Sequence, residues 1–148
     1  MKYRVISVGK PSLAYAKTGV EEYLKRLKRY ASVEWISVRE TGDSAANSRR
    51  QLERVGTDPI LLLDEKGELL GTREMADRLG QKRDQGQTRL SILIGGADGH
   101  GDEVRSRAWQ TWALGRITLQ HELALLVWCE QLYRIHTLWA GSPYHREG

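Results

Sequence analysis

The sequence contains no phenylalanine and only one cysteine, Cys129. A single cysteine excludes a disulfide framework and favours a reducing compartment. Its apolar neighbours Val127 and Trp128 favour a buried core residue over a nucleophile. Five tryptophans and six tyrosines supply the aromatic side chains instead of phenylalanine. We therefore expect a core that forms without covalent cross-links.

Long apolar runs are also missing. The longest, residues 123–129, is seven residues, whereas a membrane-spanning helix needs about 20. The first eight residues lack the apolar region and cleavage site of a signal peptide and instead indicate a first strand. At 148 residues the chain is long enough for one domain, 1–148, and short for two. We expect a cytoplasmic protein with no membrane segment, and we assign no metal ligands.

The net charge of +4 favours a polyanionic partner only mildly. The distribution of the cations along the chain is more informative than the net charge. Three segments stand out: Lys25, Arg26, Lys28 and Arg29; Arg49, Arg50 and Arg54; and Arg146 near the end. The first group lies on the polar face of a predicted helix. A solvated helix surface and an RNA contact explain that face equally well, and both alternatives stay open.

Strand and helix patterns alternate along the chain, with no internal repeats. Apolar runs or alternation predict strands at 3–8, 33–38, 60–63, 91–94 and 117–119. Helical periodicity predicts helices at about 14–30, 48–55, 72–80 and 121–139, and a further one that includes Val104, Ala108 and Trp112. Residues 39–47 and 64–67 indicate a loop and a turn. This alternation predicts an α/β fold, with a mainly parallel sheet flanked by helices.

The most informative stretch is 91–121, where an apolar run breaks into the glycine loop 95–101. Four of the seven loop residues are glycine. A buried strand that leads into a glycine loop at a helix start forms the nucleotide-sized crevice of α/β proteins, since glycine lets a ligand approach the backbone. A tight turn with no ligand is the alternative.

Two phosphate-binding signatures are absent from this loop. A P-loop requires Lys-Ser or Lys-Thr after its last glycine, but Asp102 and Glu103 follow here. The dinucleotide pattern G-x-G-x-x-G is missing too. The two carboxylates suit the positive end of a helix dipole but would repel a phosphate. We therefore expect an adenosine-type cofactor bound without a polyphosphate, or a cationic ligand.

The last predicted helix, 121–139, is apolar on nearly all sides. Such a helix in a small protein needs cover on two sides, and one cover could be a second subunit.

Several short motifs occur in order over nearly the whole chain. They are Leu63-Asp64-x-x-Gly67, Ile94-Gly95-Gly96-Ala97-x-Gly99, Thr118-Leu119-x-His121, Glu130-Gln131-Leu132-Tyr133-Arg134 and Pro143-Tyr144-His145-Arg146-Glu147. Each is weak alone, but the ordered set resembles the large-subunit ribosomal RNA pseudouridine N3-methyltransferases of the SPOUT class. The resemblance implies a C-terminal trefoil knot, which general topology rules would not suggest. It also implies a homodimer, S-adenosyl-L-methionine held in the knot, and ribosomal RNA or the ribosome as partner.

By position, the resemblance places cofactor contacts at eight residues: Leu63, Gly96, Gly115, Arg116, Ile117, Thr118, Leu119 and Gln120. Methyl transfer requires alignment of nucleophile, methyl and sulfonium, and N3 of pseudouridine must lose its proton. The groups available for this are His121, His145 and Arg146, with Tyr144 able to stack on or hydrogen-bond a base. Which of them takes the proton is left open. A structural role for His121 and a frayed end for the C-terminal residues are the alternatives.

The chain departs from the family pattern at three positions. Gln120 replaces a proline, Leu125 an arginine and Ile135 an alanine. Two other functions therefore compete with ribosomal RNA methylation. One is an RNA-binding protein with altered catalysis, and the other is a methyltransferase for another RNA or a small molecule.

Overall fold

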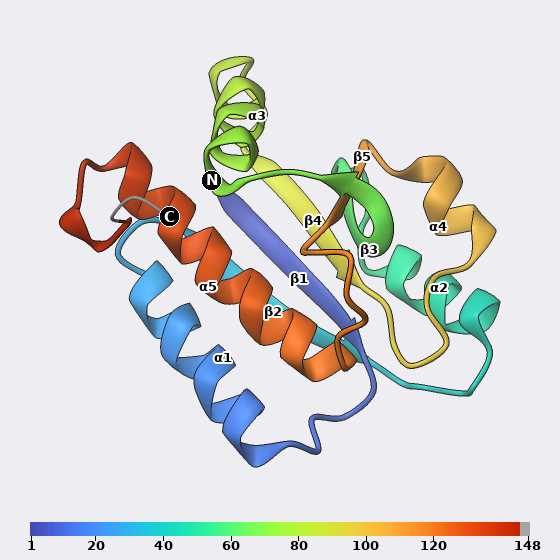
Figure 1. The fold of residues 1–148 in the computed structure, drawn as a ribbon. Coiled ribbons are helices and arrows are strands. Elements are labelled where there is room, and N and C mark those ends of the chain that lie inside the picture. The colour runs from blue at the N-terminus through green and yellow to red at the C-terminus, as the bar shows by residue number, and fades with distance from the viewer. Residues whose placement is uncertain (146–148) are drawn as a thin grey trace.

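The computed structural model describes residues 1–145, with the backbone alone at residue 145. The described residues form one sheet with helices on both faces (Figure 1). The strands are β1 (Lys2–Val8), β2 (Ser32–Val38), β3 (Ile60–Leu69), β4 (Arg89–Ile94) and β5 (Gln110–Ala113). The helices are α1 (Ala14–Leu27), α2 (Ser44–Glu53), α3 (Thr72–Asp84), α4 (Asp102–Arg107), α5 (His121–Trp139) and the 3₁₀ turn η1 (Pro143–His145).

All strand pairs in the sheet of the described residues are parallel, in the order β2-β1-β4-β3-β5. The predicted α/β fold with a mainly parallel sheet is thus confirmed. The trefoil knot that the resemblance implies stays a prediction.

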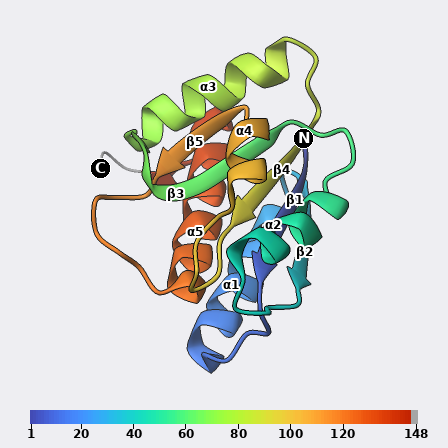
Figure 2. The ribbon, with the colours of Figure 1, turned by 90° about the vertical axis from the view of Figure 1, so that its right-hand side faces the viewer.

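Alternation along the strands divides the apolar side chains into two cores. On β1, Tyr3 and Val5 face α1, α3 and α5, whereas Ile6 and Val8 face α2 and α4. Figure 2 shows α2 and α4 on the near side of the sheet with α5 behind it. Both faces are covered, which explains why β3 and β4 contain continuous apolar runs.

The predicted turn at 64–67 interrupts β3. Leu63 and Glu68 both pair with Trp112 on β5, so the four residues between them project from the ladder. Gly67 brings this projection back onto β5. A Cβ atom there would lie 2.7 Å from the carbonyl oxygen of Thr111, so only glycine fits without a shift of the backbone.

Two predicted helix boundaries are wrong. Helix α2 begins at Ser44, inside the predicted loop 39–47, because Asp43 accepts a hydrogen bond from the Ala45 backbone N–H and caps the helix. Helix α3 continues past the predicted end at Gly80 to Asp84. Gly80 is buried, with room beside the Trp139 indole, and its lack of a side chain does not end the helix.

The chain between α4 and α5 also differs from expectation. Helix α4 ends at Arg107, and Trp112 lies on the short strand β5. Residues 117–119, predicted as a strand, form a loop in which Ile117 is 68% exposed. Helical periodicity predicted the wrong element here because it reports only that Trp112 is buried. The sheet and α5 bury this side chain, and they do so although a strand and not a helix carries it.

Helix α5 has the predicted bounds, and the Gln120 side chain caps it. Gln120 Oε1 accepts hydrogen bonds from the backbone N–H groups of Glu122 at 2.7 Å and Leu123 at 3.1 Å. The buried Glu122 carboxylate in turn accepts from Ser12 N at 2.7 Å, Ser12 Oγ at 2.8 Å and Leu13 N at 3.1 Å. These bonds tie the start of α1 to the start of α5.

Candidate functional site

An open cleft of about 710 Å³ lies at the carboxyl ends of β3 and β4. It is lined by Arg105 of α4 and by three segments: 63–66 after the first half of β3, 94–100 at the end of β4 and after it, and residues between 114 and 124 that lead into α5. In parallel α/β sheets, ligands bind at this edge, and the volume is typical of a small-molecule site.

Most sequence-predicted cofactor positions meet in this cleft. Seven of the eight line it: Leu63, Gly96, Gly115, Ile117, Thr118, Leu119 and Gln120. The eighth, Arg116, instead donates hydrogen bonds to the carbonyl oxygens of Glu65 at 2.7 Å and Gly67 at 2.9 Å. Thr118 Oγ1 donates to Glu65 Oε2 at 2.6 Å. These bonds tie the segment 116–118 to the turn at 64–67.

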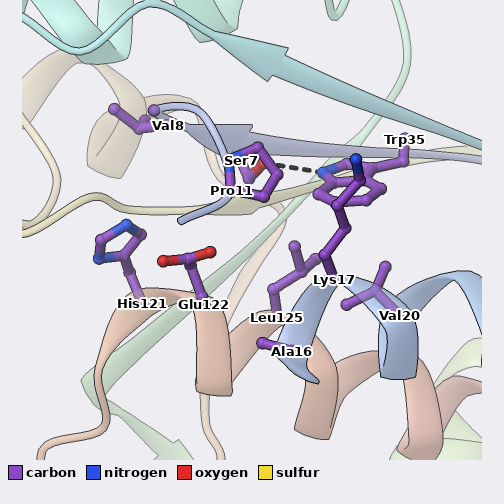
Figure 3. Close-up of a pocket in the computed structure, with 11 residues that line it drawn as sticks. Ser7, Val8, Pro11, Ala16, Lys17, Val20, Trp35, His121, Glu122 and Leu125 are labelled. Carbon is purple, nitrogen blue, oxygen red and sulfur yellow. Dashed lines mark hydrogen bonds between the residues drawn. The ribbon is translucent and has the colours of Figure 1, made fainter. Parts of the chain in front are cut away.

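His121 lines the cleft from the first residue of α5. It also borders a small cavity formed with Lys17, Trp35 and Glu122, where it lies beside Glu122 (Figure 3). The described residues offer the His121 ring no hydrogen bond or ion pair. The alternative of a structural histidine that satisfies backbone groups therefore has no contact to support it. Leu125, where the resemblance implied an arginine, is buried and lines this cavity.

The glycines of the cleft serve different purposes. A Cβ atom at Gly96 would lie 3.0 Å from Cγ1 of Val8, and one at Gly95 would lie 3.1 Å from the backbone of Gly99. The fold itself thus favours glycine at both positions. At Gly115 the nearest atom to an added Cβ would be Ile117 Cγ1 at 3.8 Å. The chain leaves room for a side chain at this position in the cleft wall.

The cleft carries charges of both signs, with one more carboxylate than cations. Asp64, Glu65 and Asp98 line it, together with Lys66 and Arg105. Arg105 is paired with Asp64 at 2.6 Å. Burial alone would raise the pKa of Asp64, but the Lys66 backbone N–H and Arg105 outweigh it and hold that pKa below its usual value. The small excess of carboxylates suits a cationic ligand better than a polyphosphate.

Sequence reasoning gave no role to His100, which lies in the same cleft. Its Nε2 is 3.0 Å from the carbonyl oxygen of Leu63, at the end of the first half of β3. Burial lowers the pKa of His100, so the ring is neutral. Its Nδ1 is buried without a hydrogen-bond partner among the described residues. Only the fold brings these two residues together, so nothing in the local sequence marks His100 beyond its place in the glycine loop.

Tyr144 lies far from the cleft of its own chain. Helix α5 separates it from His121, and 18 steps of an α-helix span about 27 Å. The Tyr144 hydroxyl is 3.4 Å from the hydroxyl of Tyr23 and 3.4 Å from Glu130 Oε1. Its ring packs on Tyr133 with centroids 4.7 Å apart, and the Arg134 guanidinium lies 5.0 Å from its centre. Burial raises the pKa of Tyr144, so the phenol is neutral near pH 7.

The other two predicted catalytic residues fall outside these contacts. The side chain of His145 and all of Arg146 lie outside the described residues. Within residues 1–145, no group of three or more His, Cys, Asp and Glu side chains is arranged to hold a metal ion. None of the helices in that range is long and apolar enough to cross a membrane.

The parallel sheet and the cleft at the carboxyl ends of its strands define an α/β protein with a cleft large enough for a small molecule. A family model described as predicted SPOUT methyltransferase matches residues 1–145. The chain belongs to the SPOUT methyltransferase family.

Within this family, the chain is similar to proteins named ribosomal RNA large subunit methyltransferase H. A relative from Thermus thermophilus is 45% identical over 146 residues, and a relative from Deinococcus radiodurans is 42% identical over 146 residues. The match covers 99% of this chain and 99% of each relative.

Solved structures show the same fold at low sequence identity. A probable methylase family protein from Haemophilus influenzae has a TM-score of 0.59 and 9% identity, and the match covers 98% of this chain and 70% of that one. A probable methyltransferase from Bordetella pertussis has a TM-score of 0.56 and 12% identity, and the match covers 90% of this chain and 95% of that one.

Proposed function

We propose that this protein is a homodimeric, S-adenosyl-L-methionine-dependent methyltransferase that modifies N3 of a pseudouridine in large-subunit ribosomal RNA. The observation that carries the proposal is the cleft, because it gathers seven of the eight positions expected to contact the cofactor. The names of the full-length relatives support ribosomal RNA as the substrate.

The residues of the cleft fit this cofactor. Leu63, Gly96 and the segment 115–120 would hold the adenosine, with the open space at Gly115 taking its bulk. Asp64, Glu65 and Asp98 provide negative charge for a sulfonium and an ammonium group. When bound, the cofactor supplies an activated methyl group.

The task left to the protein is to align the base and remove its N3 proton. His121 lines the cleft with no hydrogen-bond partner among the described residues, so its ring is available to accept that proton. Segment 115–120, clamped by Arg116 and Thr118, would keep the reacting atoms in line.

A second subunit would complete the site. Tyr144 cannot reach the cleft of its own chain, because α5 lies between them. If two α5 helices pack antiparallel, the end of one meets the start of the other, and Tyr144 approaches the partner's cleft. Ile117 and Val127, which are 68% and 38% exposed, provide apolar surface for that contact.

The decisive experiment measures methyl transfer. Purified protein and tritiated S-adenosyl-L-methionine are incubated with large ribosomal subunits from a strain that lacks this methylation, and the product nucleoside is identified by mass spectrometry. We expect 3-methylpseudouridine. Cofactor binding without methylation of these subunits would overturn the proposal and favour either an RNA-binding protein or another substrate. Absence of cofactor binding in calorimetry at millimolar ligand would exclude both methyltransferase hypotheses.

A further inference from the structure

The last turn of α1 and the two residues that follow the helix carry an exposed cationic surface that the proposed chemistry does not use. We define the α1 patch as Lys25, Arg26, Lys28 and Arg29, all exposed. Leu27 between them is fully buried in the core. The buried leucine fixes the rotation of this turn, so the four cations on either side of it project to solvent.

The patch combines restrained and unpaired cations. Arg26 pairs with Glu22 at 3.0 Å, and its guanidinium lies 5.3 Å from the ring centre of Tyr23. Arg29 lies 5.9 Å from the ring centre of Tyr30. Within residues 1–145, Lys25, Lys28 and Arg29 form no ion pair with a carboxylate. Three positive charges therefore remain for an anionic partner.

The α1 patch adjoins the start of the C-terminal tail, residues 143–148. The hydroxyls of Tyr23, on the same helix, and Tyr144 are 3.4 Å apart. Arg26 also lies 5.8 Å from the ring centre of Tyr133, against which Tyr144 packs. Figure 1 shows the end of α5 and the turn that follows it beside the end of α1. A large ligand that contacts Tyr144 at the start of this tail can therefore also contact the neighbouring α1 patch.

Phosphates need such a surface, because the cleft offers them little. Three carboxylates line the cleft against two cations, Lys66 and Arg105, and Arg105 is already paired with Asp64. The cleft therefore offers little attraction to a phosphate, and the phosphates that flank a bound nucleotide gain more from cations elsewhere on the surface. Lys and Arg side chains beside half-buried tyrosine rings provide both charge and stacking surface for RNA.

We propose that the α1 patch binds the RNA backbone next to the target nucleotide, on the subunit whose tail completes the site. The inference rests on the proposed function, since it takes the tail to lie at the RNA site. It assigns Lys25, Lys28 and Arg29 to phosphates and leaves cofactor binding to the cleft.

The test compares two triple variants with equal loss of charge. The patch variant is Lys25→Gln/Lys28→Gln/Arg29→Gln. The control is Arg49→Gln/Arg54→Gln/Arg107→Gln, which removes three exposed cations on the side of α2 and α4. Each protein is measured for thermal unfolding, cofactor affinity, methyl transfer, and binding to purified large-subunit ribosomal RNA at several salt concentrations.

We expect the patch variant to keep its cofactor affinity and to raise the KM for RNA about tenfold at roughly 0.15 M salt, which corresponds to about 1.4 kcal/mol. The slope of log binding constant against log salt should fall by about 2, the value for three lost phosphate contacts on single-stranded RNA. The control should change both quantities far less.

Three results would overturn the inference. The first is unchanged RNA binding by the patch variant, and the second is an equal loss in the control, which would reflect total charge. The third is a defect that appears with whole subunits and vanishes with protein-free RNA, which would assign the patch to a ribosomal protein. If the wild-type protein binds this RNA through the α1 patch but methylates nothing, the proposed function is contradicted, whereas the assignment of the patch to RNA binding is still supported.

Discussion

Glycines 96 and 115 line the same cleft but are constrained by different neighbours. At Gly96 an added methyl group would press on Val8 in the core, so a large side chain there would disturb packing as well as ligand binding. A substitution such as Gly96→Val therefore cannot isolate the cofactor contact. At Gly115 the atom nearest to an added Cβ would be 3.8 Å away, so the protein has room for a methyl group at this position of the proposed cofactor site.

Gly115→Ala should leave the melting temperature unchanged and weaken cofactor binding about tenfold, because the added methyl group occupies space that the adenosine needs. Calorimetry with S-adenosyl-L-methionine measures this. Gly80→Ala is the matched control: it adds the same methyl group inside α3, away from the cleft, and should leave affinity unchanged. Wild-type affinity in Gly115→Ala would place the adenosine elsewhere.

Strand β3 pairs with β5 again after the projecting turn at 64–67, and glycine at position 67 makes this close approach possible. Gly67→Ala should destabilise the fold by about 1–3 kcal/mol, since the methyl group would meet backbone atoms of Thr111 and Trp112 that cannot rotate away. Urea unfolding followed by tryptophan fluorescence gives the difference. Alanine at Gly71, where an added Cβ would lie 3.5 Å from the nearest atom, is the comparison. Equal stability of the Gly67 variant and wild type would contradict this account.

The hydrogen bonds of Glu122 join two helices, and they depend on pH. Burial alone would raise the pKa of Glu122, but hydrogen bonds from Ser12 and Leu13 outweigh it, so the folded-state pKa lies below the usual value of 4.5. The ionised carboxylate therefore adds stability above pH 4.5, and this stability is lost as the pH falls through the folded-state pKa.

Glu122→Ala should accordingly cost about 1–3 kcal/mol at pH 7, because Ser12 and Leu13 lose a charged acceptor. The difference from wild type should shrink as the pH is lowered below about 4.5. Denaturant titrations of both proteins at neutral, mildly acidic and strongly acidic pH measure it. A difference that stays constant over this range would show that the carboxylate charge is not what holds α1 to α5.

The Gln120 departure has a physical role at the start of α5. The proline that the resemblance implied here would have no side-chain acceptor to cap the helix, whereas Gln120 supplies one and also donates to Glu122 Oε2 at 3.3 Å. The other two residues that differ from the pattern implied by the resemblance, Leu125 and Ile135, are both buried in the interior.

For the whole molecule, the main prediction is a site shared between subunits. Light scattering should give about twice the chain mass of 16.9 kDa. Deletion of residues 143–148 should preserve the dimer and cofactor affinity and abolish methyl transfer, because the cleft and the tail belong to different subunits in each site. If the truncated protein keeps wild-type turnover, residues 143–148 have no role in methyl transfer.

Mixed dimers make the shared site directly testable. His121→Ala and the truncated protein should each be inactive, but equal mixing after subunit exchange should restore about a quarter of wild-type activity. About half of the dimers would then be mixed, and each would hold one site with an intact His121 and the other chain's intact tail. No recovery, despite proven exchange, would place both parts of the site within one chain.

Local patterns in the chain were enough to predict the alternation of strands and helices, the parallel sheet and the bounds of α5. Apolar runs mark β3 and β4, and helical periodicity extends from His121 to Trp139. The absence of a polyphosphate signature was also visible, because Asp102 and Glu103 follow the glycine loop.

Which distant groups meet could be learned only from the folded chain. Trp112 lies on strand β5, and its indole is buried in the core. The loop 117–119 is held at the cleft by the hydrogen bond from Arg116 to the carbonyl oxygen of Glu65, 51 positions away. His100 reaches Leu63 across 37 positions, and Glu122 reaches Ser12 across 110. Local periodicity reports which face of an element is buried, but it carries no information about the partner that buries it.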